Sequence, residues 1–91
     1  MKVKIYATLR EMLGVKSIDM MLSEPTPVRR VLQSVVDGYP ALRSKLWNSD
    51  GTLTGYVTVL LGGKSIEYLD GLESMVEDSD TMSLFPPVGG G

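Results

Sequence analysis

Apolar and polar residues alternate over the first part of the chain. Residues 2–8 place Val3, Ile5 and Ala7 on one side and polar residues on the other, which predicts a half-buried strand. Residues 9–13 predict a single helical turn that Gly14 ends. Residues 17–22 alternate again and predict a second strand, close enough in sequence to pair antiparallel with the first.

The next segment has the spacing of an amphipathic helix. Apolar residues fall at positions i, i+3, i+4, i+7 and i+8, namely Val28, Val31, Leu32, Val35 and Val36. Because the residue before a proline favours extended backbone, Thr26 is predicted to be the N-cap and Pro27 the first helical residue. Gly38 is the predicted C-cap. Leu42 and Leu46 can share one face of a short second helix.

The pattern of the second half of the chain predicts three strands. Residues 56–61 are the most strand-like, and Gly62-Gly63 predicts a tight turn into residues 64–66. A last strand is predicted from Thr81 to Phe85, where the two following prolines end it. The order is therefore strand, strand, helix, strand, strand, strand. It predicts an α+β fold in which the main helix covers the apolar face of a sheet.

Composition removes several classes of function. The 91 residues correspond to one small domain, and they include no Cys and no His. Disulfides, thiolate metal sites, cysteine nucleophiles and Ser-His-Asp triads are thereby excluded, and no metal site is expected. No apolar run approaches the roughly 20 residues of a membrane span, and the first residues lack a signal-peptide pattern. We therefore expect a cytoplasmic protein without a membrane partner.

The net charge of −2 is unevenly distributed, because residues 1–46 carry a net +4 and residues 47–91 a net −6. No basic cluster is interleaved with aromatic residues, so a nucleic-acid partner is not expected. The acidic residues of the second half either steer the end of the chain toward a basic partner or form an ordinary solvated surface.

The segment best suited to chemistry is the last one, Phe85-Pro86-Pro87-Val88-Gly89-Gly90-Gly91. A glycine run lacks Cβ atoms and can enter a channel too narrow for side chains, and a terminal carboxylate becomes an electrophile once it is activated. A frayed terminus or a cloning remnant is the alternative interpretation. We expect residues 1–87 to form the folded domain and residues 88–91 a flexible tail.

Several segments together resemble the MoaD/ThiS sulfur carriers, especially the small subunit of molybdopterin synthase. They are the opening strand and turn of residues 3–14, the valine-rich helix followed by Tyr39-Pro40, and the hairpin strand before Gly63. The most specific is the ending, with Asp78-Ser79-Asp80 followed by residues 84–88 and the terminal glycines. The family tail usually has two glycines, whereas here Gly89 makes three. Family members also often carry Asn where this chain has Gly62.

The resemblance implies a ubiquitin-like β-grasp fold with the last strand central and parallel to the first. It implies that an E1-like adenylating enzyme uses ATP to activate Gly91, and that a sulfur donor enzyme then converts the adenylate to a thiocarboxylate. The molybdopterin synthase large subunit would receive this tail during molybdenum cofactor biosynthesis. The chain itself would bind no cofactor and would act as a cosubstrate, not an enzyme.

On this resemblance the functional residues are Gly91 and Gly90 at the reactive end. Phe85, Pro86, Pro87, Val88 and Gly89 would contact partners, although Phe85 alternatively closes the core. Trp47 is either an interface anchor or a cover for the core edge. Two other functions remain open. One is a protein modifier joined to lysines through Gly91, and the other is a non-covalent β-grasp binding module.

Overall fold

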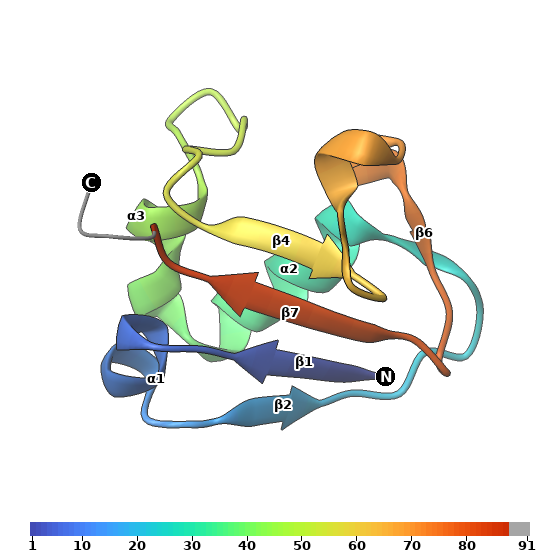
Figure 1. Cartoon of the computed structure of the whole chain (residues 1–91), viewed down its shortest axis with the longest axis horizontal. Helices are drawn as coiled ribbons and strands as arrows, with labels where there is room; N and C mark the ends of the chain where they lie inside the picture. Colours follow the sequence, from blue (N-terminus) through green and yellow to red (C-terminus); the bar gives the residue numbers. More distant parts are fainter. Residues whose placement is uncertain (88–91) are drawn as a thin grey trace.

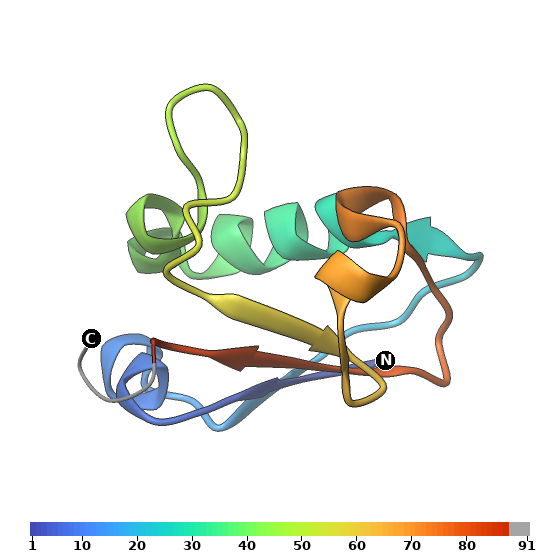
Figure 2. The same cartoon turned by 45° about the horizontal axis from the view of Figure 1, so that its top comes forward.

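The computed structural model describes residues 1–87, which form a mixed sheet with one long helix lying across it (Figures 1 and 2). The five-stranded sheet has the order β2-β1-β7-β4-β5. Its strands are β1 (Lys2–Ile5), β2 (Ser17–Asp19), β4 (Thr58–Leu61), β5 (Lys64–Ser65) and β7 (Thr81–Phe85). A separate two-stranded sheet pairs β3 (Thr26–Pro27) with β6 (Met75–Val76).

Three α-helices and three 3-10 turns connect the strands. The α-helices are α1 (Thr8–Leu13), α2 (Val28–Gly38) and α3 (Arg43–Leu46). The 3-10 turns are η1 (Pro40–Leu42), η2 (Ile66–Tyr68) and η3 (Gly71–Glu73). No helix in residues 1–87 is long and apolar enough to cross a membrane.

The last strand, β7, lies at the centre of the sheet. It pairs in parallel with β1, where Val3 is opposite Met82, and antiparallel with β4, where Val59 is opposite Leu84. Parallel neighbours require a crossover between them, and α2 supplies it by packing on one face of the sheet. The α+β prediction and the ubiquitin-like β-grasp fold implied by the resemblance are both confirmed.

The apolar face of α2 closes the core as the helical spacing predicts. All five predicted residues are at most 1% exposed, namely Val28, Val31, Leu32, Val35 and Val36. They pack with the inward residues of β1 and β7, which are Val3, Ile5, Met82 and Leu84. Leu42 and Leu46 are also fully buried, so the short second helix is confirmed. The outward residues of β1 and β7 therefore form the opposite face of the sheet.

Several local predictions are wrong. Gly38 is the last residue of α2, and Tyr39 is its C-cap. The strands predicted at residues 17–22 and 56–61 are shorter, at Ser17–Asp19 and Thr58–Leu61.

Ala7 is exposed and lies beyond the end of β1, with a positive φ of 52°. Thr26 does not cap α2: its hydroxyl donates to the carbonyl of Glu24 at 2.9 Å, and the helix begins at Val28 after Pro27. The amide of Val28 instead donates to the carbonyl of Ser74 at 2.9 Å. Tertiary contact with β6 thus replaces the side-chain cap.

Asp78 ties together three segments that are distant in sequence. One carboxylate oxygen accepts from the backbone N–H of Leu22 at 2.9 Å and from the Met1 ammonium at 3.2 Å. The hydrogen bond from Leu22, followed by the bond and the charge of the ammonium, lowers the pKa of Asp78 from its ordinary value. The turn that precedes β7 is thereby joined to the start of β1 and the exit of β2.

Leu32→Ala should lower the free energy of unfolding by about 2–5 kcal/mol, because it removes a buried side chain from the centre of the core. Urea denaturation measures the change. Ser34→Ala, on the exposed face of the same helix, serves as the control and should change stability by no more than about 0.5 kcal/mol. Equal effects of the two substitutions would contradict the assigned core.

Asp78→Asn should lower the melting temperature at neutral pH and have little effect at low pH. A carboxylate whose pKa is lowered by folding stabilises the fold above its unfolded pKa of about 3.9, and this contribution is lost as the pH falls through the lower folded value. Asparagine keeps the acceptor but removes the charge. Thermal melts of both proteins between about pH 2 and pH 7 measure the difference, which should shrink below about pH 4.

The control for this comparison is Glu77→Gln, which neutralises an adjacent exposed carboxylate that accepts none of these hydrogen bonds. A difference between wild type and Asp78→Asn that stays constant over the whole pH range would show that the charge of Asp78 contributes nothing.

Candidate functional site

The end of β7, with the predicted site residue Phe85, lies at one edge of the molecule, on the same side as α1 (Figures 1 and 2). Phe85 is the last residue of β7 and is partly buried. Pro86 is buried and Pro87 is exposed. The remaining predicted site residues lie outside the described residues: Val88, Gly89, Gly90 and Gly91. The predicted boundary at residue 87 and the predicted flexible tail therefore stay predictions.

The position of β7 explains why the chain leaves the sheet where it does. The last bonds of β7 are made at its C-terminal end, where Phe85 is opposite Thr58 and the carbonyl of Leu84 accepts from the amide of Tyr6 at 3.2 Å. Pro86 and Pro87 have no N–H with which to continue the ladder. The chain must therefore depart from the middle of the sheet, between β1 and β4.

The aromatic ring of Phe85 stacks on that of Tyr6, with the ring centroids 4.2 Å apart and the planes 8° from parallel. Both residues belong to the outward-facing set, so Phe85 does not close the core beneath α2. Offset stacking of this kind stabilises an aromatic pair beyond the area that it buries. The sheet surface at the base of the tail thus carries an apolar, partly exposed pair. We call Tyr6 and Phe85 the aromatic pair.

Arg10 contacts the Tyr6 ring of the aromatic pair. Its guanidinium lies 5.3 Å from the centre of the Tyr6 ring, and its Nε–H donates to the carbonyl of Ile5 at 2.6 Å. The sequence reasoning missed Tyr6 and Arg10 as site residues. The signal in the sequence was that Tyr6 and Arg10 are four residues apart, at the end of a predicted strand and in the helical turn after it. The contact itself follows only from the fold.

A strained residue positions this edge. Ala7, which separates Tyr6 from α1, has φ 52° and ψ −132°, a conformation that suits glycine. The turn is closed by the amide of Leu9 donating to the carbonyl of Tyr6 and the amide of Arg10 donating to the carbonyl of Ala7, at 3.2 and 2.9 Å. Such strain costs about 1–3 kcal/mol and persists only where surrounding contacts impose it.

Arg10 is the charged residue whose contact with the aromatic pair is resolved. Lys4, which is exposed, lies on β1, two residues before Tyr6. The acidic residues Glu77, Asp78 and Asp80 precede β7, and a five-residue strand is about 17 Å long. They are therefore at the opposite end of the strand from Phe85. Asp78 and Asp80 accept backbone hydrogen bonds in the turn before β7, so their carboxylates have a local structural role.

No group of three or more His, Cys, Asp or Glu side chains in the described part of the chain is placed to hold a metal ion. Within residues 1–87, the pKa is lowered at Asp78 and Asp50, and both are exposed residues whose carboxylates accept structural hydrogen bonds. A Thr52 hydroxyl and the Thr52 amide donate to Asp50 and lower its pKa. The described surface at the tail offers contacts to a partner and no acid–base pair.

The sequence pattern of the ThiS family matches residues 3–91, nearly the whole chain. The chain belongs to the ThiS family. The match includes all of the segments on which the sequence resemblance was based, and it covers the glycine run as well as the folded residues.

Individual relatives agree with this assignment. The ThiS-family chain is 36% identical to small archaeal modifier protein 3 of Haloferax volcanii, over the whole of this chain and 98% of the relative. Its structure is similar to the crystal structure of SAMP1 from Haloferax volcanii, with a TM-score of 0.85 and 30% identity over 99% of this chain and 97% of that one. It is also similar to a chain in the BexX/CysO complex of Amycolatopsis orientalis, with a TM-score of 0.79, 25% identity and 99% and 98% coverage.

Ala7→Gly should raise the free energy of unfolding of the ThiS-family chain by about 0.5–2 kcal/mol. Glycine relieves the strain at positive φ. The free energy gained in this way is larger than the entropic free-energy cost of fixing a glycine on folding. Ala41→Gly is the matched control, because Ala41 is exposed in η1 and has no positive φ, and it should destabilise by about 0.5–1 kcal/mol. Urea denaturation of both variants measures the contrast. If both destabilise equally, Ala7 is not strained.

Proposed function

We propose that this ThiS-family chain is a ubiquitin-like carrier whose Gly91 carboxylate is activated by adenylation and then transferred as an acyl group. The observation that carries the proposal is the position of β7. This central strand leads directly into Pro86-Pro87 and the glycine run, beside the partly exposed aromatic pair. The full-length similarity to a small archaeal modifier protein supports the same function.

The activation has a simple chemical reason. A free carboxylate is a poor acyl donor, because its oxygen is a poor leaving group. An oxygen of the Gly91 carboxylate would attack the α-phosphorus of ATP, and pyrophosphate would leave. The product is an acyl adenylate, in which AMP is the leaving group for the next nucleophile. The enzyme that performs this step would be E1-like, and the carrier would supply the carboxylate and the docking surface but no general base.

Conjugation to lysine is the first candidate for the second step. The amine of a target lysine would attack the adenylated carbon and expel AMP, which leaves an amide bond to Gly91. The relatives with full-length similarity are named as modifiers, and this supports the candidate.

Sulfur transfer is the second candidate, and membership in the ThiS family supports it. A sulfur donor would replace AMP at the same carbon and produce a thiocarboxylate. The molybdopterin synthase large subunit is one possible recipient. That recipient rests on the sequence resemblance alone and stays a prediction.

The aromatic pair gives the proposed partners a place to dock. An activating enzyme that encloses Val88, Gly89 and Gly90 in a narrow channel would also contact the surface at the channel mouth. Phe85 and Pro87 form this surface together with Tyr6 and Arg10, whereas Pro86 is buried. Aromatic residues and arginine are the residue types most often found at energetically important positions of interfaces. The docking surface would determine affinity, and the tail would determine reactivity.

Adding one residue after Gly91 should abolish adenylation while leaving the fold intact. The extra residue displaces the carboxylate by about 3.3–3.6 Å, and a misplacement of only 1 Å can cost about 100-fold in rate. The assay is ATP–pyrophosphate exchange with a purified E1-like enzyme. Sulfide or a lysine-bearing target protein is added next, and intact mass is measured. Wild type should gain either the sulfur-for-oxygen mass difference or the mass of the target.

Phe85→Ala is the matched comparison in this assay. It should raise the carrier concentration needed for half-maximal exchange by about tenfold and leave the maximal rate nearly unchanged, because it removes docking contacts and not the carboxylate. Deletion of Gly90 and Gly91 should eliminate the exchange. If the extended variant were adenylated as readily as wild type without being trimmed, the carrier function would be wrong. The non-covalent binding module would then be the better account.

A further inference from the structure

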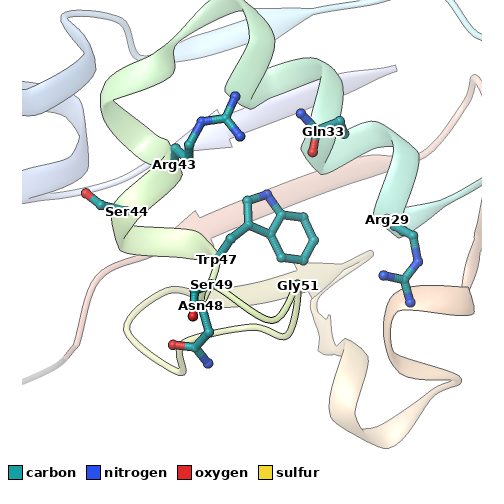
Figure 3. Close-up of a pocket in the computed structure, with 8 residues that line it drawn as sticks. All are labelled: Arg29, Gln33, Arg43, Ser44, Trp47, Asn48, Ser49 and Gly51. Carbon is teal, nitrogen blue, oxygen red and sulfur yellow. The ribbon is translucent and has the colours of Figure 1, made fainter.

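A surface pocket of about 570 Å³ lies on the helical layer, between α2, α3 and the loop of residues 48–51 (Figure 3). Arg29 and Gln33, one helical turn apart on the outer face of α2, form one wall. Arg43 and Trp47, at the two ends of α3, form another. The backbone amide of Trp47 donates to the carbonyl of Arg43 at 2.9 Å, which fixes the two residues relative to each other. We call this feature the Trp47 pocket.

The Trp47 pocket contains a hydrogen-bond donor without an acceptor. The indole N–H of Trp47 is buried and has no hydrogen-bond partner among the described residues. In Figure 3 the indole nitrogen points toward the space between the Arg43 and Gln33 side chains. Buried polar groups in folded proteins are nearly always paired, so an orphaned N–H at a pocket requires an explanation. An acceptor brought by a ligand would satisfy it.

The guanidinium of Arg43 is a second free donor. It makes no ion pair or hydrogen bond with any side chain in the described part of the protein. Arg29 differs, because Glu73 accepts from it at 2.8 and 3.1 Å. The amide nitrogen of Gln33 donates to Asp37 at 2.9 Å. Among the neighbouring carboxylates, Glu73 pairs with Arg29, Asp37 accepts from Gln33 and Asp50 accepts from Thr52. None of the residues that line the pocket is acidic.

The charge of the pocket differs from that of the chain. The protein carries a net charge of −2, whereas the residues that line the pocket include two arginines and no carboxylate. Arg29 is paired with Glu73, so the positive charge open to a ligand is that of Arg43. The indole ring of Trp47 supplies an apolar surface between the two arginines. A partner that fits this combination has a carboxylate for Arg43 and an apolar side chain for the ring. Tryptophan and arginine are also the residue types that contribute most at protein interfaces.

We propose that the Trp47 pocket is a docking site for an acidic, extended segment of a protein partner. One oxygen of an Asp or Glu side chain of that segment accepts from Arg43, and the other accepts from the indole N–H of Trp47. The neighbouring apolar side chain of the segment packs on the indole ring. Because the indole nitrogen has no exposed surface in the free protein, the Arg43 and Gln33 side chains must shift as the segment enters. Side-chain rearrangements of this kind are common when proteins bind.

The location of the pocket determines what such docking permits. The pocket belongs to the helical layer, which covers one face of the sheet (Figure 2). The aromatic pair is not part of the core between that layer and the sheet. A partner held at the Trp47 pocket therefore leaves the base of the tail accessible. The proposal does not depend on activation of Gly91, since no residue of the tail takes part in it.

The test is a titration of the full-length protein with the blocked peptide acetyl-Leu-Glu-Asp-Leu-amide. Trp47 is the only tryptophan of the chain, so its fluorescence and the NMR signal of its indole N–H report on the pocket directly. Both signals should change in a saturable way, and the backbone amides of residues 48–51 should shift with them. Binding should weaken as the ionic strength rises. The control peptide acetyl-Leu-Gln-Asn-Leu-amide should bind at least about tenfold more weakly.

Variants assign the effect to the proposed groups. Arg43→Gln should weaken binding of the acidic peptide by about tenfold or more. Trp47→Phe should weaken it by about three- to tenfold. Binding to this second variant is measured from the NMR shifts of the backbone amides, because the variant has no tryptophan signal. Arg30→Gln removes the same charge from a part of α2 that does not line the pocket, and it should bind within about twofold of wild type. Circular dichroism melts establish that each variant is folded.

Three results of the peptide titrations would overturn the proposal. The first is that the acidic peptide gives no saturable change at millimolar concentration, and the second is that the amide control peptide binds equally well. The third result is that the Arg43→Gln variant binds the acidic peptide as tightly as the Arg30→Gln variant does. A parallel titration with inorganic phosphate and with acetate completes the test. If either ion produced the same shifts with the same affinity as the peptide, the pocket would be a small-anion site and the peptide proposal would be wrong.

Discussion

The parallel pairing of β7 with β1 is the interaction on which the rest of the structure depends. It places the last strand in the centre of the sheet, between β1 and β4, so that Met82 and Leu84 become core residues beneath α2. Two parallel strands cannot be joined by a tight turn, and the long connection between them contains the helix that covers them. The same pairing also fixes the exit of the chain at Pro86. The position of the candidate site is thus a consequence of core packing.

Elements whose stability depends on apolar periodicity could be predicted from the sequence. The buried face of α2, the bounds of β7 and the Gly62-Gly63 turn all follow from local pattern, and the turn glycines indeed have φ of 58° and 85°. Ala7 and the start of α2 could not be predicted, because tertiary contacts override local preference there. The pairing of β3 with β6 involves strands of two residues each, too short to carry a periodic signal. Phe85 was identified from the sequence, but its stacking on Tyr6 required the fold.

The fold separates acidic residues that are close to the C-terminus in sequence from the end of β7. The acidic turn of residues 77–80 lies at the start of β7, where Asp78 joins the ends of β1 and β2, so its carboxylate has a structural role. At the other end of β7, Phe85 stacks on Tyr6, and the Arg10 guanidinium lies 5.3 Å from the centre of the Tyr6 ring. Charge counted along a sequence predicts net properties of a domain, but a strand of about 17 Å is enough to separate two neighbouring segments. The net charge of each half of the sequence therefore does not predict the charge at either end of β7.

A small carrier must keep its chemistry independent of its stability. Among residues 1–87, sixteen buried apolar residues form the core, and all of them precede Pro86. Substitutions in the glycine run consequently remove none of this buried area, whereas a domain of 91 residues has only a few kcal/mol of stability to lose. The aromatic pair is the one place where the two demands meet, because Phe85 belongs both to the central strand and to the surface at the tail. Its partner Tyr6 is followed by a strained turn, so the fold gives up some stability to keep the Tyr6 ring against Phe85.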